Sequence, residues 1–140
     1  MSAQENSGPP SGDLLLAARA AAARAYAPFS KFRVGAALRT KAGGVFTGCN
    51  VENASYGLTM CAERNAIAAA VASEGPSVRI AAIAVAVDAA EPFPPCGACR
   101  QVMAEFSAPH AEVCYAGNAG EPVRTTVGEL LPQAFRLRAK

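Results

Sequence analysis

The sequence predicts an α/β domain, a three-layer α/β/α sandwich around one mixed five-stranded sheet. Helix-like and strand-like segments alternate along the chain, an order that this architecture accommodates economically. Residues 80–87 are continuously apolar, as expected of a central strand that is buried on both faces. Gly43 and Gly44 separate two short strand-like runs, as in a hairpin.

The length and composition favour a single domain. The chain has 140 residues, of which 51% are hydrophobic, and this is enough apolar material to fill one core. Residues 1–12 are polar and rich in Gly, Pro and Ser, so they bury too little apolar surface to become ordered. We therefore expect a flexible tail over residues 1–12 and one domain over residues 13–140.

The first half of the expected domain contains one helix and the hairpin. Residues 14–26 are rich in alanine and place apolar side chains near one face, and Ala27-Pro28 ends this helix. Two strands are expected at residues 34–40 and 45–50.

The second half alternates helices and strands. A helix fits residues 61–73, because Gly75-Pro76 then breaks the pattern, and the apolar strand 80–87 follows. A third helix is expected at residues 97–106, after Pro94-Pro95. The remaining elements are strands near 112–116 and 123–125 and a last helical turn before Pro132.

Charge and hydropathy exclude several classes of partner. There are 13 Lys and Arg residues against 11 Asp and Glu, and the basic residues are scattered, so no nucleic-acid footprint is visible. No segment has the roughly 20 apolar residues that span a bilayer. Arg19 and Arg24 interrupt the first apolar run, unlike a signal peptide. We expect a cytoplasmic protein with no nucleic-acid or membrane partner.

Five cysteines suggest metal binding more than disulfides. Their number is odd and no secretion signal accompanies them, which indicates a reducing compartment. Cys49 and Cys114 lie at strand-like positions without ligand spacing, so we expect them to pack in the interior. His110 lies in an expected loop without a partner motif, and we expect it at the surface.

The other three cysteines have the pattern of a metal site. Cys61 opens one expected helix, and Cys96 and Cys99 open another. Three protein ligands leave one position open on a tetrahedral zinc ion, which distinguishes a catalytic site from a closed structural one. Helix N-termini also favour thiolate over thiol. We therefore expect one Zn²⁺ per chain.

Two charged residues next to Cys61 complete the expected chemistry. A zinc deaminase needs a carboxylate that moves protons without binding the metal, and Glu63 follows a ligand at the spacing known for such enzymes. Three thiolates reduce the Lewis acidity of zinc. Arg64 is one turn from Cys61 and can offset this charge by donating hydrogen bonds to the thiolates.

A wider set of motifs resembles a known family, the small, homotetrameric, zinc-dependent cytidine deaminases. The resemblance covers essentially residues 14–135 and rests on residues 26–37, 48–56, 61–64, 95–102 and 130–132. It implies hydrolysis of cytidine and deoxycytidine to uridine and deoxyuridine with release of ammonia, as in pyrimidine salvage. It also implies a homotetramer with a nucleoside substrate.

The resemblance further implies substrate contacts. Phe32 would stack on the pyrimidine, the Ala62 backbone would meet the base carbonyl, and Asn50 and Glu52 would bind the ribose. Tyr56 and Phe135 would reach into the sites of neighbouring subunits. The chain departs from the family pattern in its longer tail, in Pro94 and in residues 57–60, none of which belongs to the catalytic set.

Three other functions remain as alternatives. One is deamination of a cytosine-bearing antibiotic such as blasticidin S. Another is a non-catalytic zinc module, which needs a fourth protein ligand from His110, Cys49 or Cys114. Editing of a nucleic acid fits the weak charge and short chain least well.

Overall fold

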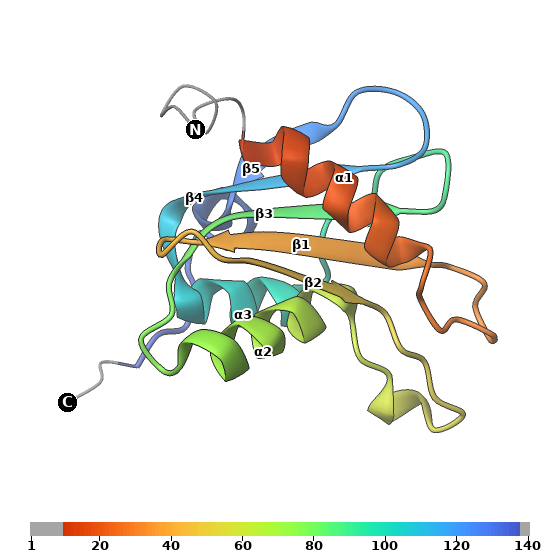
Figure 1. The fold of residues 1–140 in the computed structure, drawn as a ribbon, viewed down its shortest axis with the longest axis horizontal. Helices are drawn as coiled ribbons and strands as arrows, with labels where there is room; N and C mark the ends of the chain where they lie inside the picture. The colour runs from red at the N-terminus through yellow and green to blue at the C-terminus, as the bar shows by residue number, and fades with distance from the viewer. Residues whose placement is uncertain (1–9, 138–140) are drawn as a thin grey trace.

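The computed structural model describes residues 10–137, which form a mixed five-stranded sheet with helices on both faces (Figure 1). The strand order is β2-β1-β3-β4-β5, with β3 and β4 parallel and the other neighbours antiparallel. The elements are α1 (Pro10–Ala22), β1 (Val34–Thr40), β2 (Val45–Cys49), the 3-10 helix η1 (Tyr56–Leu58), α2 (Ala62–Glu74), β3 (Ile80–Val87), α3 (Gly97–Phe106), β4 (Ser107–Ala116), β5 (Val123–Thr126) and α4 (Val127–Leu130). The expected fold class is confirmed.

The side chains of β3 explain the three layers. Ala82, Ala84 and Ala86 pack with α1 on one face, and Ile83 and Val85 pack with α2 and α3 on the other (Figure 1). Alanines on the α1 face allow a close approach of helix and sheet. The approach is closest at Gly35, where a Cβ atom would collide with the backbone of Ala18 and Ala22. This face therefore requires small residues, whereas the other accommodates branched ones.

The sheet topology brings the start of β1 and the end of β3 to the same edge of the sheet. Val34 begins β1 directly opposite Val87, the last residue of β3. The segment that enters β1 and the loop that leaves β3 consequently lie side by side. The helices α2 and α3 both begin near this edge, so their first turns face the same space (Figure 1).

Helix α1 is shifted relative to the expected segment 14–26. It begins at Pro10, so residues 10–12, expected in the tail, are helical, and it ends at Ala22. The end is earlier because Tyr26 joins the sheet edge, where its N–H donates to the Asn50 carbonyl at 3.0 Å. The expected flexibility of residues 1–9 concerns a part outside the described residues.

Strand β4 is longer than expected. It begins at Ser107, which pairs with Ile80 of β3, and a register irregularity follows before the pairing resumes at Glu112. His110 therefore lies in a strand and not in a loop, although it is exposed as expected. Within residues 10–137, no helix is long and apolar enough to cross a membrane.

Candidate active site

Three thiols meet where α2 and α3 begin. Cys61 and Cys96 are the extended residues that precede these helices, and Cys99 lies in the first turn of α3. The three Sγ atoms all lie within 4.8 Å of one another, and those of Cys61 and Cys96 are 3.9 Å apart. Tetrahedral zinc with Zn–S bonds near 2.3 Å requires sulfur atoms about 3.8 Å apart. The donor set therefore fits zinc in both chemistry and spacing.

The protons of this cluster are unevenly distributed. A hydrogen bond from the Cys99 thiol and a second one from Arg64 lower the pKa of Cys61 to about 5. The pKa of Cys99 is raised because it shares its proton with Cys61 and because it is buried. A metal ion would have to displace the Cys99 proton, since a metal binds the deprotonated thiolate.

Arg64 is directed at the thiols and not at solvent. Its Nη2 donates to the Cys61 Sγ at 3.2 Å, and this bond raises the already high pKa of the guanidinium. Its Nε is buried and has no hydrogen-bond partner among the described residues. Arg64 is therefore placed where it can offset the negative charge of a thiolate cluster.

Glu63 is a buried carboxyl group beside the thiols. Only 5% of the residue is exposed. Burial is the main cause that raises its pKa, and the negative charge of Cys61 raises it further. A carboxyl group with a raised pKa can exchange a proton closer to neutral pH, as an acid–base group must.

A cavity of about 230 Å³ opens beside Glu63 and the thiols. Its walls come from the first residues of α2, from the β3–α3 loop, from the end of β2 and from the paired ends of β1 and β3. The residues that line it are Phe32, Val34, Asn50, Thr59, Cys61, Ala62, Glu63, Val85, Val87, Phe93, Pro94 and Cys96. Phe32, Asn50 and Ala62, all expected to contact substrate, therefore lie in one cavity with two of the clustered thiols, Cys61 and Cys96.

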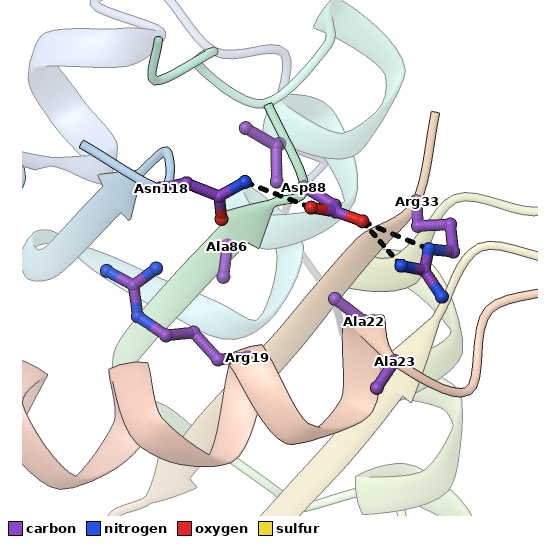
Figure 2. A pocket seen from close by; sticks show the side chains of 8 residues that line it. Arg19, Ala22, Ala23, Arg33, Ala86, Asp88 and Asn118 are labelled. Atoms are coloured by element: carbon purple, nitrogen blue, oxygen red, sulfur yellow. Dashed lines mark hydrogen bonds and ion pairs between the residues drawn. The ribbon is translucent and has the colours of Figure 1, made fainter. Parts of the chain in front are cut away.

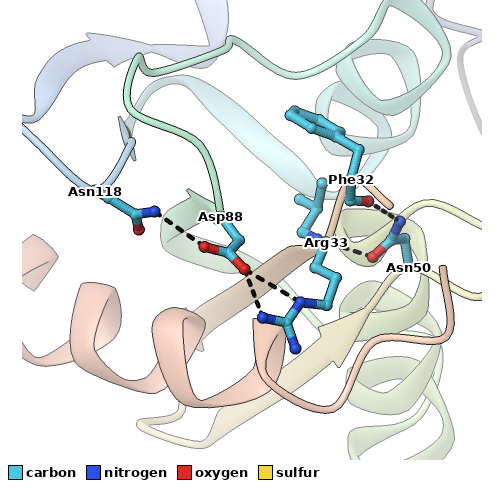
Figure 3. A network of polar contacts seen from close by, with 6 residues as sticks. Phe32, Arg33, Asn50, Asp88 and Asn118 are labelled. Atoms are coloured by element: carbon cyan, nitrogen blue, oxygen red, sulfur yellow. Dashed lines mark hydrogen bonds and ion pairs between the residues drawn. The ribbon is translucent and has the colours of Figure 1, made fainter. Parts of the chain in front are cut away.

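A polar network joins the segment before β1, the start of the β3–α3 loop and the β4–β5 loop. Asp88 accepts from Arg33 Nη2 at 2.5 Å and Nε at 3.2 Å, and from Asn118 Nδ2 at 2.9 Å (Figure 2). These bonds lower the pKa of Asp88, with Asn118 as the largest cause. The three residues, together with Arg19, line a separate cavity of about 190 Å³ against α1 (Figure 2). Arg33 and Phe32 point in opposite directions, so this second cavity is not part of the thiol site (Figure 3).

Asn50 holds Phe32 in place through the backbone. Its Oδ1 accepts from the Val34 N–H at 2.8 Å, and its Nδ2 donates to the Phe32 carbonyl at 2.8 Å (Figure 3). One N–H of the amide is left for a ligand. Asn50 thus positions the aromatic wall and can also contact substrate.

Glu52 and Tyr56 lie in an adjoining cavity of about 400 Å³, which shares Thr59 with the first. The Glu52 carboxylate accepts from the N–H groups of Phe29 and Ser30 at 3.0 and 3.2 Å, and from the Ser30 hydroxyl. The hydroxyl is the largest cause that lowers the pKa of Glu52. Glu52 therefore also anchors residues 29–30, a role that the sequence did not predict.

Phe135 is not brought to the site within one chain. It is 68% exposed, lines neither cavity, and contributes its carbonyl to a bond from Gln101 Nε2 at 2.8 Å. Sequence reasoning also missed Phe93, whose ring is 5.3 Å from that of Phe32 at an angle of 89°. Its place just before Pro94 and Cys96 was a signal that could have identified it.

Sequence comparisons point to one family. The model described as the cytidine and deoxycytidylate deaminase zinc-binding region matches residues 11–117. A cytidine deaminase of Halalkalibacterium halodurans is 56% identical over 112 residues, which cover 79% of this chain and 83% of the relative. A cytidine deaminase of Sporosarcina psychrophila is 45% identical over 122 residues, covering 87% and 88% of the two chains.

Structural comparison agrees. The crystal structure of cytidine deaminase from Burkholderia pseudomallei matches with a TM-score of 0.82 and 49% identity, covering 96% of this chain and 100% of that chain. A blasticidin-S deaminase of Bacillus cereus is 36% identical over 113 residues, covering 76% and 79% of the two chains. The similarity to these cytidine deaminases is thus greater than that to the antibiotic-modifying enzyme.

Proposed function

This chain belongs to the cytidine and deoxycytidylate deaminase family, and from that premise we propose that it hydrolyses cytidine and deoxycytidine to uridine and deoxyuridine, releasing ammonia. One observation carries the proposal. The buried carboxyl group of Glu63 lines the same cavity as Cys61 and Cys96, two of the three clustered thiols. A zinc deaminase requires both the metal ligands and a separate proton carrier.

The metal ligands are Cys61, Cys96 and Cys99, which would hold one zinc ion per chain. When bound, zinc supplies a Lewis acid that makes a water molecule a stronger nucleophile. The hydrogen bond from Arg64 withdraws negative charge from the Cys61 thiolate. The zinc ion would therefore be a stronger Lewis acid than with three uncompensated thiolates.

Glu63 is the proton carrier in this proposal. Its carboxylate takes one proton from the attacking water and delivers it to N3 of the pyrimidine as the water oxygen bonds to C4. It then takes the second proton from the new C4 hydroxyl and delivers it to the amino group, so that the C4–N bond breaks, ammonia leaves and the C4 carbonyl forms. Phe32 offers an apolar surface to the base, and the Ala62 backbone lies in the wall where the base carbonyl would bind. The apolar walls exclude water, which strengthens the contacts to the reacting atoms.

The test of this function is ammonia release from purified protein that contains zinc. Cytidine, deoxycytidine and blasticidin S are compared as substrates, with loss of cytosine absorbance as a second readout. We expect turnover of both nucleosides and a much lower kcat/KM for the antibiotic. Faster turnover of blasticidin S would instead assign the antibiotic as substrate, and no ammonia from any of the three would reject deamination.

A non-catalytic zinc module fits the geometry less well. The three candidates for a fourth protein ligand lie elsewhere: His110 is exposed on β4, Cys114 is buried in the core on the α1 face, and Cys49 ends β2. Within residues 10–137, the clustered metal-ligating side chains are only the three cysteines. A cluster with three protein ligands leaves a position open for chemistry.

We propose that Asn50 and Glu52 recognise the ribose. Asn50 keeps one free N–H in the main cavity, and Glu52 keeps a lone pair on Oε2 in the adjoining one. A carboxylate that accepts from a sugar hydroxyl contributes about 1.5–3 kcal/mol. A phosphate on that hydroxyl would meet the Glu52 charge, which disfavours cytosine in a nucleic-acid chain.

Glu52→Ala should lower kcat/KM for cytidine about 10–150-fold while zinc stays bound. Part of this loss would come from residues 29–30, which Glu52 anchors. Glu52→Gln separates the two effects, because it keeps the size but removes the charge. We expect this variant to narrow the wild-type preference for cytidine over cytidine 3′-phosphate. An unchanged preference in Glu52→Gln would place ribose recognition elsewhere.

We further propose that four chains assemble and that Tyr56 and Phe135 reach into neighbouring sites. The support is the exposure of large apolar side chains that line the adjoining cavity, with Tyr56 81% and Phe29 51% exposed. Light scattering of the active fraction should give the mass of a tetramer. Phe135→Ala should lower kcat/KM for cytidine at unchanged zinc content. An active monomer would contradict both expectations.

The cellular setting is also part of the proposal. Thiolate ligands persist in a reducing compartment, which supports a cytoplasmic location. Conversion of free cytidine and deoxycytidine to uridine and deoxyuridine is a reaction of pyrimidine salvage.

A further inference from the structure

We propose that Phe93 determines specificity at C5 of the pyrimidine, by closing the cavity against substituents at that position. The proposal rests on the function proposed above, because the orientation of a bound cytosine base determines which edge of the base meets Phe93. It concerns a residue outside the metal ligands and the proton carrier.

Phe93 lies in the cavity wall without being part of the core. It belongs to the loop between β3 and α3 and lines the cavity with Pro94 and Cys96. It is 45% exposed, so much of its ring surface is available to a ligand. Its described ring contact is the perpendicular one with Phe32.

The start of this loop is fixed by the network around Asp88. The Asp88 carboxylate accepts hydrogen bonds from Arg33 and Asn118 (Figure 3). The Asn118 N–H also donates to the Ala89 carbonyl at 2.7 Å. The Ala119 N–H donates to the Ala90 carbonyl at 3.2 Å. The loop is therefore held at residues 88–90, a few residues before Phe93, so the ring is attached to a supported segment.

The order of atoms in the pyrimidine ring decides which edge Phe93 meets. C4 must face the thiols, because the amino group leaves from it, and N3 must face Glu63, which protonates it. C5 lies on the other side of C4. Ala62 and Glu63 both come from the start of α2, whereas Phe93 and Pro94 come from the β3–α3 loop. C5 is thereby directed to the wall that contains Phe93.

The angle between the two rings supports a steric role. A base that lies parallel to Phe32 is perpendicular to Phe93, because the two phenyl planes differ by 89°. Phe93 then cannot stack on the base in parallel and meets it at an edge. A group added to the C5 edge would collide with a supported aromatic ring.

The experiment compares kcat/KM for cytidine, 5-methylcytidine and 5-iodocytidine. The measured ratio is kcat/KM for each 5-substituted substrate divided by kcat/KM for cytidine. Phe93→Ala should raise this ratio by about tenfold or more, as expected when a pocket gains room for a small group. Phe93→Trp should lower the same ratio. Val45→Ala is the control, because Val45 is a similarly exposed apolar residue (46%) at the start of β2, outside this cavity and the adjoining one, and its ratio should stay within twofold of wild type.

A binding measurement makes the test independent of turnover. Calorimetry gives Kd for uridine and 5-methyluridine, which carry the same C5 edge, and Phe93→Ala should favour the methylated ligand relative to wild type. Ratios within twofold of wild type in Phe93→Ala and Phe93→Trp, in kinetics and binding, would overturn the proposal. Absence of cytidine turnover in the wild type would reject the proposed function instead, and the binding ratio would still decide the role of Phe93.

Discussion

Glu63→Gln should lower kcat for cytidine by about 10²–10⁴-fold while zinc and nucleoside remain bound. The substitution keeps the size of a buried side chain but removes its ability to accept and return a proton. Burial raises the pKa of Glu63, which suits a group that is protonated and deprotonated in one catalytic cycle. Because glutamine is neutral, the change also removes the cost of burying a carboxylate, so the fold should not be destabilised by charge.

Single-turnover kinetics, zinc analysis and uridine binding together test this prediction. Glu105→Gln is the matched control, since Glu105 is an exposed glutamate near the end of α3 and outside the cavity, and its kcat should match wild type. A Glu63→Gln enzyme with kcat within tenfold of wild type would assign proton transfer to another group. Loss of zinc from the same variant would instead indicate that Glu63 supports the metal site.

The elements that the sequence predicted well are those that depend on local chemistry. Strand β3 matched its apolar run, and α3 matched the segment after Pro94-Pro95, because breakers and periodicity act over a few residues. The end of α1 was misplaced because Tyr26 pairs with the chain near Asn50, far along the sequence. Such pairing is a tertiary interaction that overrides helix propensity.

The same distinction applies to the site. The clustering of the three thiols could be expected because each is attached to the start of a helix. The place of Phe93 just before Cys96 indicates that it lies near the thiols, but its contact with the Phe32 ring could not be predicted, since that contact depends on the pairing of β1 with β3. Glu52 was expected at the ribose, and its bonds to residues 29–30 could not be read from a motif because they join distant segments.

Replacing Cys61, Cys96 or Cys99 singly with alanine should remove zinc and with it all measurable deamination. Each change deletes one of the three protein bonds to the metal, and the affinity of the protein for zinc falls steeply with each lost ligand. Metal analysis of the purified variants should give well below one zinc per chain. Cys49→Ala is the control, because Cys49 lies at the end of β2 outside the cluster, and it should keep one zinc per chain.

Metal removal and return separate the loss of a ligand from the loss of the fold. A chelator should abolish wild-type activity, and added zinc should restore it, since the thiols converge through the arrangement of two helices and not through the metal alone. The three alanine variants should regain little activity at the same zinc concentration, although their circular dichroism matches that of the metal-free wild type. Zinc content equal to wild type in all three would move the metal to other residues. Such a result would also leave the Arg64 contact with Cys61 as an ordinary side-chain bond and remove its role in charge compensation.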